Sequence, residues 1–566
     1  RYTWHPDMRQ WTAHLDGVAL ETPLVPLRAD PGSHQHRTLA FAVLYTALLL
    51  LVFVVTLDGM TAFLYLNYAC SEFNALASFG TVSIVQQLVC AVSKPPVAMA
   101  TDRLGRMYAL VLAVACAVAG YLVMGYAHSL PVLVAGVLIQ TVGYTGIQVL
   151  QTVIIADTTS AKWRGLVLGM VNVPFLINFG IAGPLAEHIL ALHGWRTGYL
   201  MWAVILPLAA LPLTCALGVG SWRARQLGPA RRAPRVLADL DLVGMGLFAG
   251  GITLVLLPMS LHMEHTSTAF ASGALVLALF VAWENHAAHP FIPCALLANP
   301  TVLCICVIGM LDFAGFYLSW AFLSAFVQVV KDWNQTATAY FASSQNVTAT
   351  VFGLIAGWSM VYFRRYKAIL LLGIVIRLIG VTLMVRYRGV DHSTTMLVVC
   401  QIVQGIGGGA VGLTMQVAAQ VAVSRSKLAL VTALELLTSE IGAAAGAALA
   451  GALFSSTLPR LLHAHVPFLS DTERRALAGS LTAVHRYAAD TPERQGIAAA
   501  WSGVMRLLCI VAFLVQIPAL VFAVLVPDAD LHDAHTRERR HSTRSETTAL
   551  LTHAPAWREC AAGTCT

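Results

Sequence analysis

The sequence predicts an all-α polytopic membrane protein with about fourteen transmembrane helices. Of its 566 residues, 57% are hydrophobic and 11% are charged, whereas soluble proteins carry roughly 25% charged residues. The apolar residues come in runs of about 20, the length at which a helix crosses the hydrocarbon core of a bilayer. The basic residues stand in short clusters between these runs, so the net charge of +7 indicates membrane topology and not nucleic-acid binding.

We expect the spans to form one group of six and one group of eight. The first group, in residues 38–220, has spans near 38–65, 76–100, 107–126, 131–155, 166–190 and 198–219. The second group, in residues 242–526, has spans near 242–261, 268–283, 300–329, 339–362, 368–385, 394–422, 429–454 and 499–526. A basic linker, residues 221–241, separates the groups, and a long loop, residues 455–497, precedes the last span.

The charges of the short loops predict how these spans are oriented across the membrane. Fourteen basic residues fall on one predicted side: Arg103, Arg106, Lys162, Arg164, Arg223, Arg225, Arg231, Arg232, Arg235, Arg364, Arg365, Lys367, Arg425 and Lys427. Four fall on the other: Arg196, Lys331, Arg386 and Arg388. Cytoplasmic loops are enriched in Lys and Arg. Residues 1–37, the linker and residues 527–566 are therefore expected in the cytoplasm, and the 455–497 loop outside.

Three further expectations concern the loop and the ends of the chain. Ser470 followed by Glu473 is a capping-box pattern, which predicts a short helix through Val484 in the outer loop. The tail after Pro527 is polar and rich in His, Arg and Thr, so we expect it to be disordered. Because the sequence begins with Arg1, we also expect residues to be missing before it.

The loop after the second span carries the most specific motif. Residues Ala98 to Arg106 place Asp102, Arg103, Gly105 and Arg106 in the order of the Gly-x-x-x-Asp-Arg-x-Gly-Arg signature of the major facilitator superfamily. Ala98 replaces the first glycine. The resemblance implies two six-helix bundles plus two additional transmembrane helices, with this loop as a conformational switch. The alternative is an ordinary basic turn on the cytoplasmic side.

Two carboxylates in the first group of spans are candidate proton-coupling residues. Asp58 stands in mid-span, where a charge is expensive and a functional role is the default hypothesis. A similar Leu-Asp occurs in the first helix of fourteen-span drug:proton antiporters. In the fifth span, Gly180, Gly183 and Pro184 predict a close-packed, bendable helix. Glu187 follows, where the antiporter signature ends in glycine, so it is either a proton site or an outer-rim carboxylate.

The remaining motifs resemble the fungal siderophore–iron transporter family. They lie at residues 155–165, which include Asp157-Thr158-Thr159, and at 177–187, 194–202, 239–244, 283–293, 404–409 and 491–494. The resemblance covers about Thr38 to Val526. It implies proton-coupled import of ferric siderophores by a carrier that is not an enzyme and holds no cofactor. Its expected partners are the chelate, protons and the lipid bilayer, and we expect a monomer.

A proton-coupled antiporter that exports drugs or exchanges glutathione is the alternative function, because related exchangers share this architecture. Asp312 and Glu440 are further proton-coupling candidates. Arg377, Tyr68, Tyr317, Trp320 and Trp501 are candidates for the substrate pathway. Each aromatic residue has the alternative of an interfacial belt role, and Trp501 stands where the family resemblance leads us to expect Tyr.

Two short patterns concern trafficking. Asn334 begins a glycosylation sequon in a loop expected outside, whereas the sequon at Asn346 falls within a span and should be unused. Glu546, Leu550 and Leu551 resemble an acidic di-leucine sorting signal. We expect the plasma membrane as the location, with an endosomal or vacuolar membrane as the alternative. We expect no resident metal site, because no His or Cys pair has convincing ligand spacing.

Overall fold

The computed structural model describes residues 33–73, 79–227, 241–261, 266–287, 292, 294–333, 335–390, 393–424, 427–479, 484, 486–488 and 491–531. The regular secondary structure of these residues is helical. The first bundle contains α2 (Ser33–Glu72), α3 (Phe79–Leu104), α4 (Arg106–Gly125), α5 (Leu130–Thr158), α6 (Ala161–Val171), α7 (Pro174–Leu192) and α8 (Gly194–Leu227). Two additional helices, α9 (Leu242–Leu261) and α10 (Thr266–Glu284), and the short α11 (Cys294–Leu297) follow.

The second bundle is built from six spans and a short outer helix. It contains α12 (Pro300–Trp320), α13 (Leu323–Lys331), α14 (Gln335–Phe363), α15 (Lys367–Tyr387), α16 (Thr394–Val421), α17 (Leu428–His465), α18 (Asp471–Gly479) and α20 (Pro492–Leu525). Within it, α12 packs on α17 and α20, and α16 packs on α14 and α15. In the first bundle, α4 packs on α5 and α8, and α2 packs on α7 and α8.

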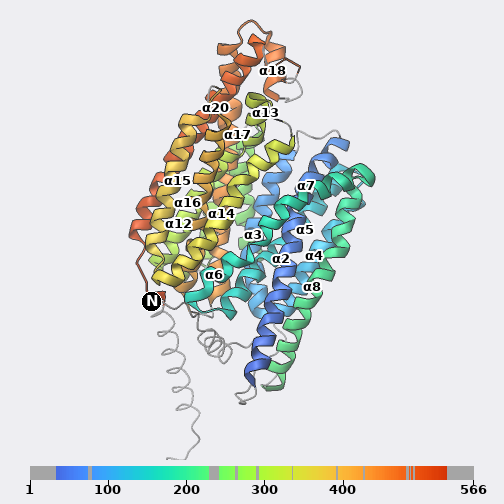
Figure 1. Ribbon diagram of the computed structural model, residues 1–566, viewed down its shortest axis with the longest axis vertical. Coiled ribbons are helices and arrows are strands. Elements are labelled where there is room, and N and C mark those ends of the chain that lie inside the picture. Colours follow the sequence, from blue (N-terminus) through green and yellow to red (C-terminus); the bar gives the residue numbers. More distant parts are fainter. Residues whose placement is uncertain are drawn as a thin grey trace, which may run out of the picture.

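The two bundles stand side by side and meet along two seams (Figure 1). We call these the α3–α17 seam and the α6–α14 seam after the helices that pack across them. The additional helix α9 pairs with α10 and also contacts both α3 and α17, so the extra pair lies beside the first seam. The bundles therefore contact each other mainly through two helix pairs.

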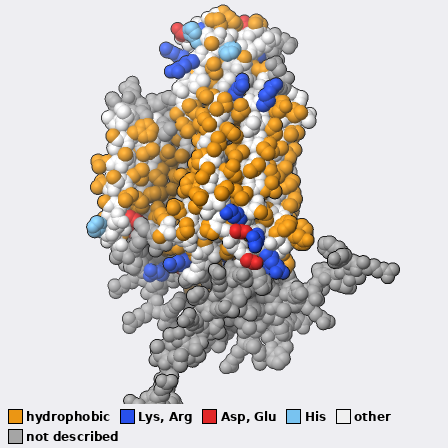
Figure 2. Space-filling view, turned by 90° about the vertical axis from the view of Figure 1, so that its left-hand side faces the viewer, with side chains coloured by type: hydrophobic (Ala, Val, Ile, Leu, Met, Phe, Trp, Pro, Cys, Tyr) orange, Lys and Arg blue, Asp and Glu red, His pale blue; other side chains and the backbone are white. Residues whose placement is uncertain are grey.

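Fourteen helical spans result when α6 joins α7 and α12 joins α13. Twelve of the described spans are long and apolar enough to cross a membrane. The other two are α3, whose polar Gln86, Gln87 and Lys94 lower its hydropathy, and α9, in which side chains are described along the apolar stretch Val243–Leu256. The surface agrees with a bilayer setting, because a broad hydrophobic band separates Lys and Arg side chains at the two ends (Figure 2).

The connection between α17 and α20 is shorter than the predicted outer loop of residues 455–497. Helix α17 continues to His465, with Leu458 and Leu462 buried one turn apart. Helix α20 begins at Pro492, because the Thr491 side chain accepts a hydrogen bond from the Arg494 backbone N–H and proline suits the first helical position. Both helices therefore extend beyond their apolar cores.

The predicted capping box forms at the start of α18. Ser470 Oγ accepts from the Glu473 backbone N–H, and Glu473 Oε2 accepts from the Ser470 backbone N–H at 2.9 Å. This reciprocal pair satisfies two backbone donors that the first helical turn would otherwise leave free. Helix α18 is described as far as Gly479 and packs against α17 at the upper end of Figure 1. Residues 480–483 lie outside the described residues, so the predicted continuation to Val484 stays a prediction.

The fifth span is interrupted, which the sequence did not predict. Helix α6 ends at Val171, Asn172 and Val173 form a turn, and α7 restarts with Pro174 at its first position. The helix then continues through Gly180, Gly183 and Pro184. The break therefore lies at least seven residues before the predicted bending site, at a point where Pro174 provides a helix start.

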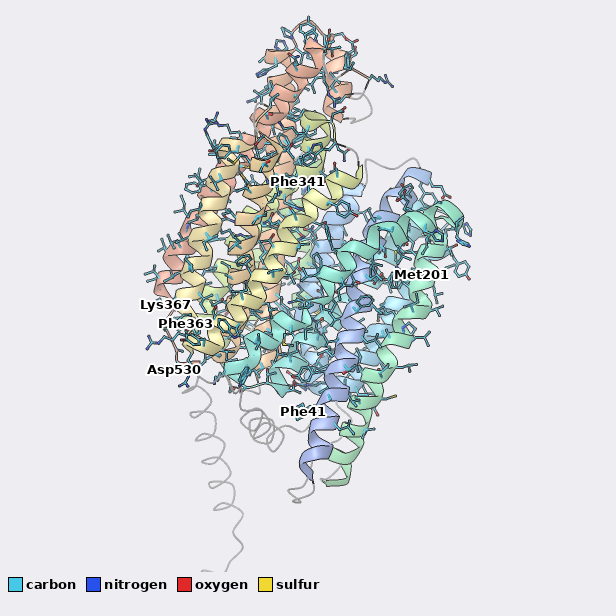
Figure 3. The ribbon with its side chains drawn as sticks, in the orientation of Figure 1. Phe41, Met201, Phe341, Phe363, Lys367 and Asp530 are labelled. Atoms are coloured by element: carbon cyan, nitrogen blue, oxygen red, sulfur yellow. The ribbon has the colours of Figure 1, made fainter. Side chains whose placement is uncertain are left out.

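The end of the last span is hydrogen-bonded to the connection between α14 and α15. Leu531 N donates to the Arg364 backbone oxygen at 3.0 Å, and Tyr366 Oη donates to the Pro527 oxygen at 2.7 Å. Figure 3 shows Phe363, Lys367 and Asp530 gathered at this end of the second bundle. Residues 527–531 thus have defined contacts, while the rest of the predicted tail, the N-terminal residues 1–32 and the linker residues 228–240 lie outside the described residues.

Candidate functional site

Asp58 is buried in the first bundle, at the middle of α2. Tyr121 Oη on α4 donates to Asp58 Oδ2, and Gln140 Nε2 on α5 donates to Tyr121 Oη at 2.8 Å. Asp58 Oδ1 has no hydrogen-bond partner within the described part of the chain. A buried carboxylate with one oxygen free inside a bundle can accept a proton, because protonation removes an expensive charge.

The loop between α3 and α4 holds a compact charge cluster. Arg106 Nη1 lies 2.8 Å from Asp102 Oδ1, and Arg106 Nε lies 3.0 Å from Asp157 Oδ2 at the end of α5. Gly105 has φ +88° and ψ 155°, a conformation that only glycine adopts readily. The switch-loop prediction thus falls on a structured turn whose Arg106 ties together three helix ends. Arg103 lies in the last turn of α3.

Asp312 and Arg377 meet inside the second bundle. Asp312 Oδ1 on α12 lies 2.8 Å from Arg377 Nε on α15, and both side chains are buried. The guanidinium also lies 5.6 Å from the centre of the Phe316 ring, within cation–π range. A Cβ on Gly408 of α16 would lie 2.4 Å from Arg377 Nη1, so this glycine makes room for the arginine. Two residues predicted to have separate roles are therefore each other's partners.

Aromatic rings extend this cluster along α12. Phe316 stacks on Trp320, and Tyr317 contacts both rings edge-on at 5.2 and 6.0 Å. Trp320 Nε1 donates to the Ala342 backbone oxygen of α14 at 3.4 Å. Tyr317 and Trp320 are partly buried, so the structure brings two predicted pathway residues next to the Asp312–Arg377 pair.

Glu440 lies at the α3–α17 seam and is paired with a lysine of the other bundle. Lys94 Nζ on α3 lies 2.8 Å from Glu440 Oε1 on α17. Below this pair, in the direction of the predicted cytoplasmic ends, Ala98, Val149 and Val153 of the first bundle form an apolar cluster with Ala429 and Ala433 of α17. The seam therefore combines one ion pair with close apolar packing.

The α6–α14 seam is a crossing of two helices through glycines. A Cβ on Gly357 of α14 would lie 2.7 Å from the Gly165 carbonyl oxygen of α6, and a Cβ on Gly169 would lie 3.1 Å from Leu354 Cα. Small residues permit such close approach of helix backbones in membranes. The glycines that pack closely in the fifth span are therefore Gly165 and Gly169.

Several predicted site residues lie apart from these clusters. A Cβ on Gly180 or Gly183 would meet nothing within 4 Å, and Pro184 and Glu187 are exposed on α7. The predicted close packing of the Gly180–Pro184 stretch is therefore wrong in this structure. Tyr68 is 57% exposed near the outer end of α2. Trp501 is buried on α20, where its ring lies 5.0 Å from that of Phe454, in the core of the second bundle.

Two trafficking predictions cannot be placed. Asn334, Glu546, Leu550 and Leu551 lie outside the described residues. Asn346 lies within α14, as expected for an unused sequon. Among the described residues, no group of three or more His, Cys, Asp or Glu side chains is arranged to hold a metal ion.

Lys94, Tyr121 and Asp157 are the residues that the sequence interpretation missed. A lysine within the apolar part of the second span was the available signal for Lys94, because intramembrane charges are rare. Tyr121 carries no comparable signal, and Asp157 was noted only as part of a motif of the resembling family. Their importance depends on the packing of α4 and α5 against Asp58 and Arg106.

Comparison with known proteins defines the class to which this arrangement of two helical bundles, two seams and buried charges belongs. The family model described as Major Facilitator Superfamily matches residues 48–288 and 305–566. The solved structure of the proton:xylose symporter XylE, bound to 6-bromo-6-deoxy-D-glucose, superimposes with a TM-score of 0.51 and 12% sequence identity. That likeness covers 87% of this chain and 97% of the symporter, and it concerns the fold.

Three curated relatives are similar over most of their length. The siderophore iron transporter mirC of Emericella nidulans is 30% identical over 87% of this chain and 85% of its own. The MFS siderochrome iron transporter C of Aspergillus fumigatus is 29% identical over 87% and 84%. The siderophore iron transporter 1 of Schizosaccharomyces pombe is 28% identical over 85% and 80%. The chain belongs to the major facilitator superfamily and, within it, to the fungal siderophore–iron transporter family.

Proposed function

We propose that this chain is a proton-coupled secondary transporter that imports ferric siderophores by alternating access. The proposed cargo rests on one observation. The chain is similar, along 80–87% of the chains compared, to relatives named siderophore or siderochrome iron transporters. A ferric chelate arrives with its iron already coordinated, so the carrier must bind a large polar ligand and needs no metal ligands of its own.

Alternating access is supported by the arrangement of the bundles. Most of the contact between the two bundles is made by two helix pairs, α3 with α17 and α6 with α14. Transporters of this type move cargo by rocking one bundle against the other around a site between them. The second bundle offers Arg377, Phe316, Tyr317 and Trp320 as a cationic and aromatic cluster for a polar chelate. This cluster is our proposed substrate-contact region.

Proton coupling is supported by the buried carboxylates. Asp58 is the first candidate because one of its oxygens is free, whereas Asp312 is neutralised by Arg377 and Glu440 by Lys94. Glu187 is the weakest candidate because it is exposed and belongs to none of the charge clusters described above. The proposed direction is import, since an inward proton gradient drives symport of cargo into the cell.

Uptake of radiolabelled ferric siderophore by iron-limited cells tests the cargo. We expect uptake above that of a matched strain lacking the protein, and dissipating the proton gradient should abolish the difference. A panel of competing ferric siderophores would identify the chelate. Equal uptake with and without the protein, together with increased efflux of a drug or of glutathione, would replace the proposal with the antiporter alternative. A fluorescent fusion would test the proposed plasma-membrane location.

A further inference from the structure

We infer that Lys94, Glu435 and Glu440 form a second proton-binding site, placed in the α3–α17 seam, which controls whether the bundles stay joined there. The inference rests on the proposed proton-coupled function and assigns part of the coupling to a site outside the Asp58 cluster. Lys94 contributes from the first bundle, and both carboxylates come from α17 of the second.

The Lys94–Glu440 bridge, the ion pair between Nζ and Oε1, connects the bundles directly. Its length is 2.8 Å, and the Lys94 and Glu440 side chains are 2% and 23% exposed. Among the described residues, the ion pair of Asp312 with Arg377 is also intramembrane, but it lies within one bundle. An ion pair across a moving interface has different energies in the two states, because the charges separate when the bundles part.

Glu435 gives the cluster a net negative charge when both of its carboxylates are ionised. It lies five residues before Glu440, is 4% exposed, and interacts electrostatically with Lys94 and Glu440. Ser439 Oγ donates to Glu435 Oε1 at 3.4 Å, but Glu435 Oε2 is buried and has no hydrogen-bond partner among the described residues. One lysine therefore faces two carboxylates, and binding of one proton brings the cluster from a net charge of −1 to zero.

In the described part of the chain, the other groups found to face this cluster include no second cation. Cys90 Sγ on α3 lies 3.9 Å from Glu440 Oε1. Tyr144 of α5 and Tyr317 of α12 interact electrostatically with Glu440. Helix α9 also packs on both α3 and α17, and it contains no titratable residue. The charge of the cluster is thus set by Lys94, the two carboxylates and the protons that they bind.

A simple linkage follows from this geometry. Lys94 stabilises ionised carboxylates while the seam is closed, so closure favours proton release. Parting of α3 from α17 removes the lysine, and the carboxylates then bind protons more tightly. By reciprocity, proton binding weakens the bridge and favours parting of the seams. Protons that enter from one side are released to the other when the seam closes again.

The α6–α14 seam provides a reporter that requires no substrate. Met360 is 1% exposed, and a Cβ on Gly165 would lie 2.5 Å from its Cε atom. A Met360→Cys thiol is therefore covered while the bundles are joined and becomes reactive when they part. We would measure its alkylation by a charged maleimide in permeabilised cells between pH 5 and pH 8, after subtracting the signal of the parent chain.

We expect alkylation of the reporter to be several-fold faster at pH 5 than at pH 8. Glu440→Gln removes the bridge, so it should give the fast rate at both pH values; Lys94→Met should do the same. The charge exchange Lys94→Glu with Glu440→Lys should restore slow alkylation at pH 8. Asp528→Asn is the matched control, because it breaks an ion pair with Arg365 inside the second bundle and should leave the pH response unchanged.

The inference would be overturned by alkylation that does not respond to pH, or by Glu440→Gln and Lys94→Met chains that reach the membrane and keep the parent's pH response. Glu435→Gln adds a second criterion, since it should shift the pH of half-maximal alkylation while leaving the bridge in place. The reporter works without cargo. Failure of siderophore uptake with an intact pH response would therefore reject the proposed cargo alone.

Discussion

Arg377 Nε lies 2.8 Å from Asp312 Oδ1, so a complete ion pair is enclosed among the helices of the second bundle. The exposed fractions of the two side chains are 7% and 5%. Neither charge can be removed alone without leaving the other unpaired in a medium of low dielectric constant, where ionised groups are poorly solvated.

Replacing Arg377 with Met should therefore destabilise the protein strongly. Loss of one partner of a buried ion pair costs about 3–5 kcal/mol, which should lower the thermal unfolding midpoint of the purified protein in detergent. The double variant Arg377→Met with Asp312→Leu should recover most of this loss, since it leaves no unpaired charge. An equal loss in both variants would show that packing and not charge pairing determines the stability here.

Asp58→Asn should reduce the pH dependence of uptake, by the part that Asp58 provides, while the protein still reaches the membrane. The amide is nearly isosteric with the carboxyl but takes up no proton, so the Tyr121 contact can persist. Tyr121→Phe is the matched variant, because it keeps the carboxylate and removes one donor. It should shift the pH profile without abolishing it. Unchanged pH-dependent transport by Asp58→Asn would exclude Asp58 from coupling.

Gly105→Ala should destabilise the switch loop through backbone strain alone. A Cβ at Gly105 would meet nothing within 4 Å, but the residue has φ +88°, and such conformations cost about 1–3 kcal/mol for other residues. Gly180→Ala is the control, because its Cβ would also meet nothing within 4 Å and its φ is ordinary for a helix. We expect a lower unfolding midpoint for Gly105→Ala and no loss for Gly180→Ala. Equal effects would contradict the strain argument.

Glu72 at the outer end of α2 should give a small, pH-dependent contribution to stability. Hydrogen bonds from Arg196 and Trp195 lower the pKa of the Glu72 carboxyl below its usual value of 4.5. A lowered folded-state pKa means that this stabilisation is fully present above pH 4.5 and is lost as the pH falls through the folded-state value. Because Glu72 and Arg196 are 46% and 34% exposed, Arg196→Gln should cost at most about 1 kcal/mol at pH 7.

The measurement is the difference in unfolding midpoint between Arg196→Gln and the parent at several pH values. The difference should shrink as the pH falls below 4.5 and Glu72 becomes protonated. A difference that is the same at pH 7 and pH 3 would assign the effect to the stacking of Arg196 on Trp195, where the guanidinium lies 4.2 Å from the ring centre.

The spans and their order could be predicted because membrane insertion is encoded locally. A run of about 20 apolar residues is sufficient to form a spanning helix wherever the rest of the chain lies. The capping box at Ser470 and Glu473 is equally local, and it formed as predicted. The extensions of α17 and α20 were missed because hydropathy marks the apolar core of a helix and not its polar ends.

The pairings within the site could not be predicted in the same way. Lys94 and Glu440 are 346 residues apart in sequence, and Asp312 meets Arg377 only because α12 and α15 surround the same interior. Hydropathy identified Asp312, Arg377 and Glu440 as unusual residues, but partner choice depends on helix rotation. The break after Val171 was also missed, although Pro174 is a helix-start signal, because the apolar run continues across it.

The turn at Asn172 and Val173 divides the fifth span into two halves that pack on different bundles. Its first half, α6, packs on α14 and α16 of the opposite bundle, whereas its second half, α7, packs chiefly on α2 and α8 of its own. The fifth span thus makes part of its contacts with each of the two bundles. If the bundles rotate relative to each other, as the proposed alternating access requires, a continuous rigid helix could not follow both, whereas two helices joined by a two-residue turn can.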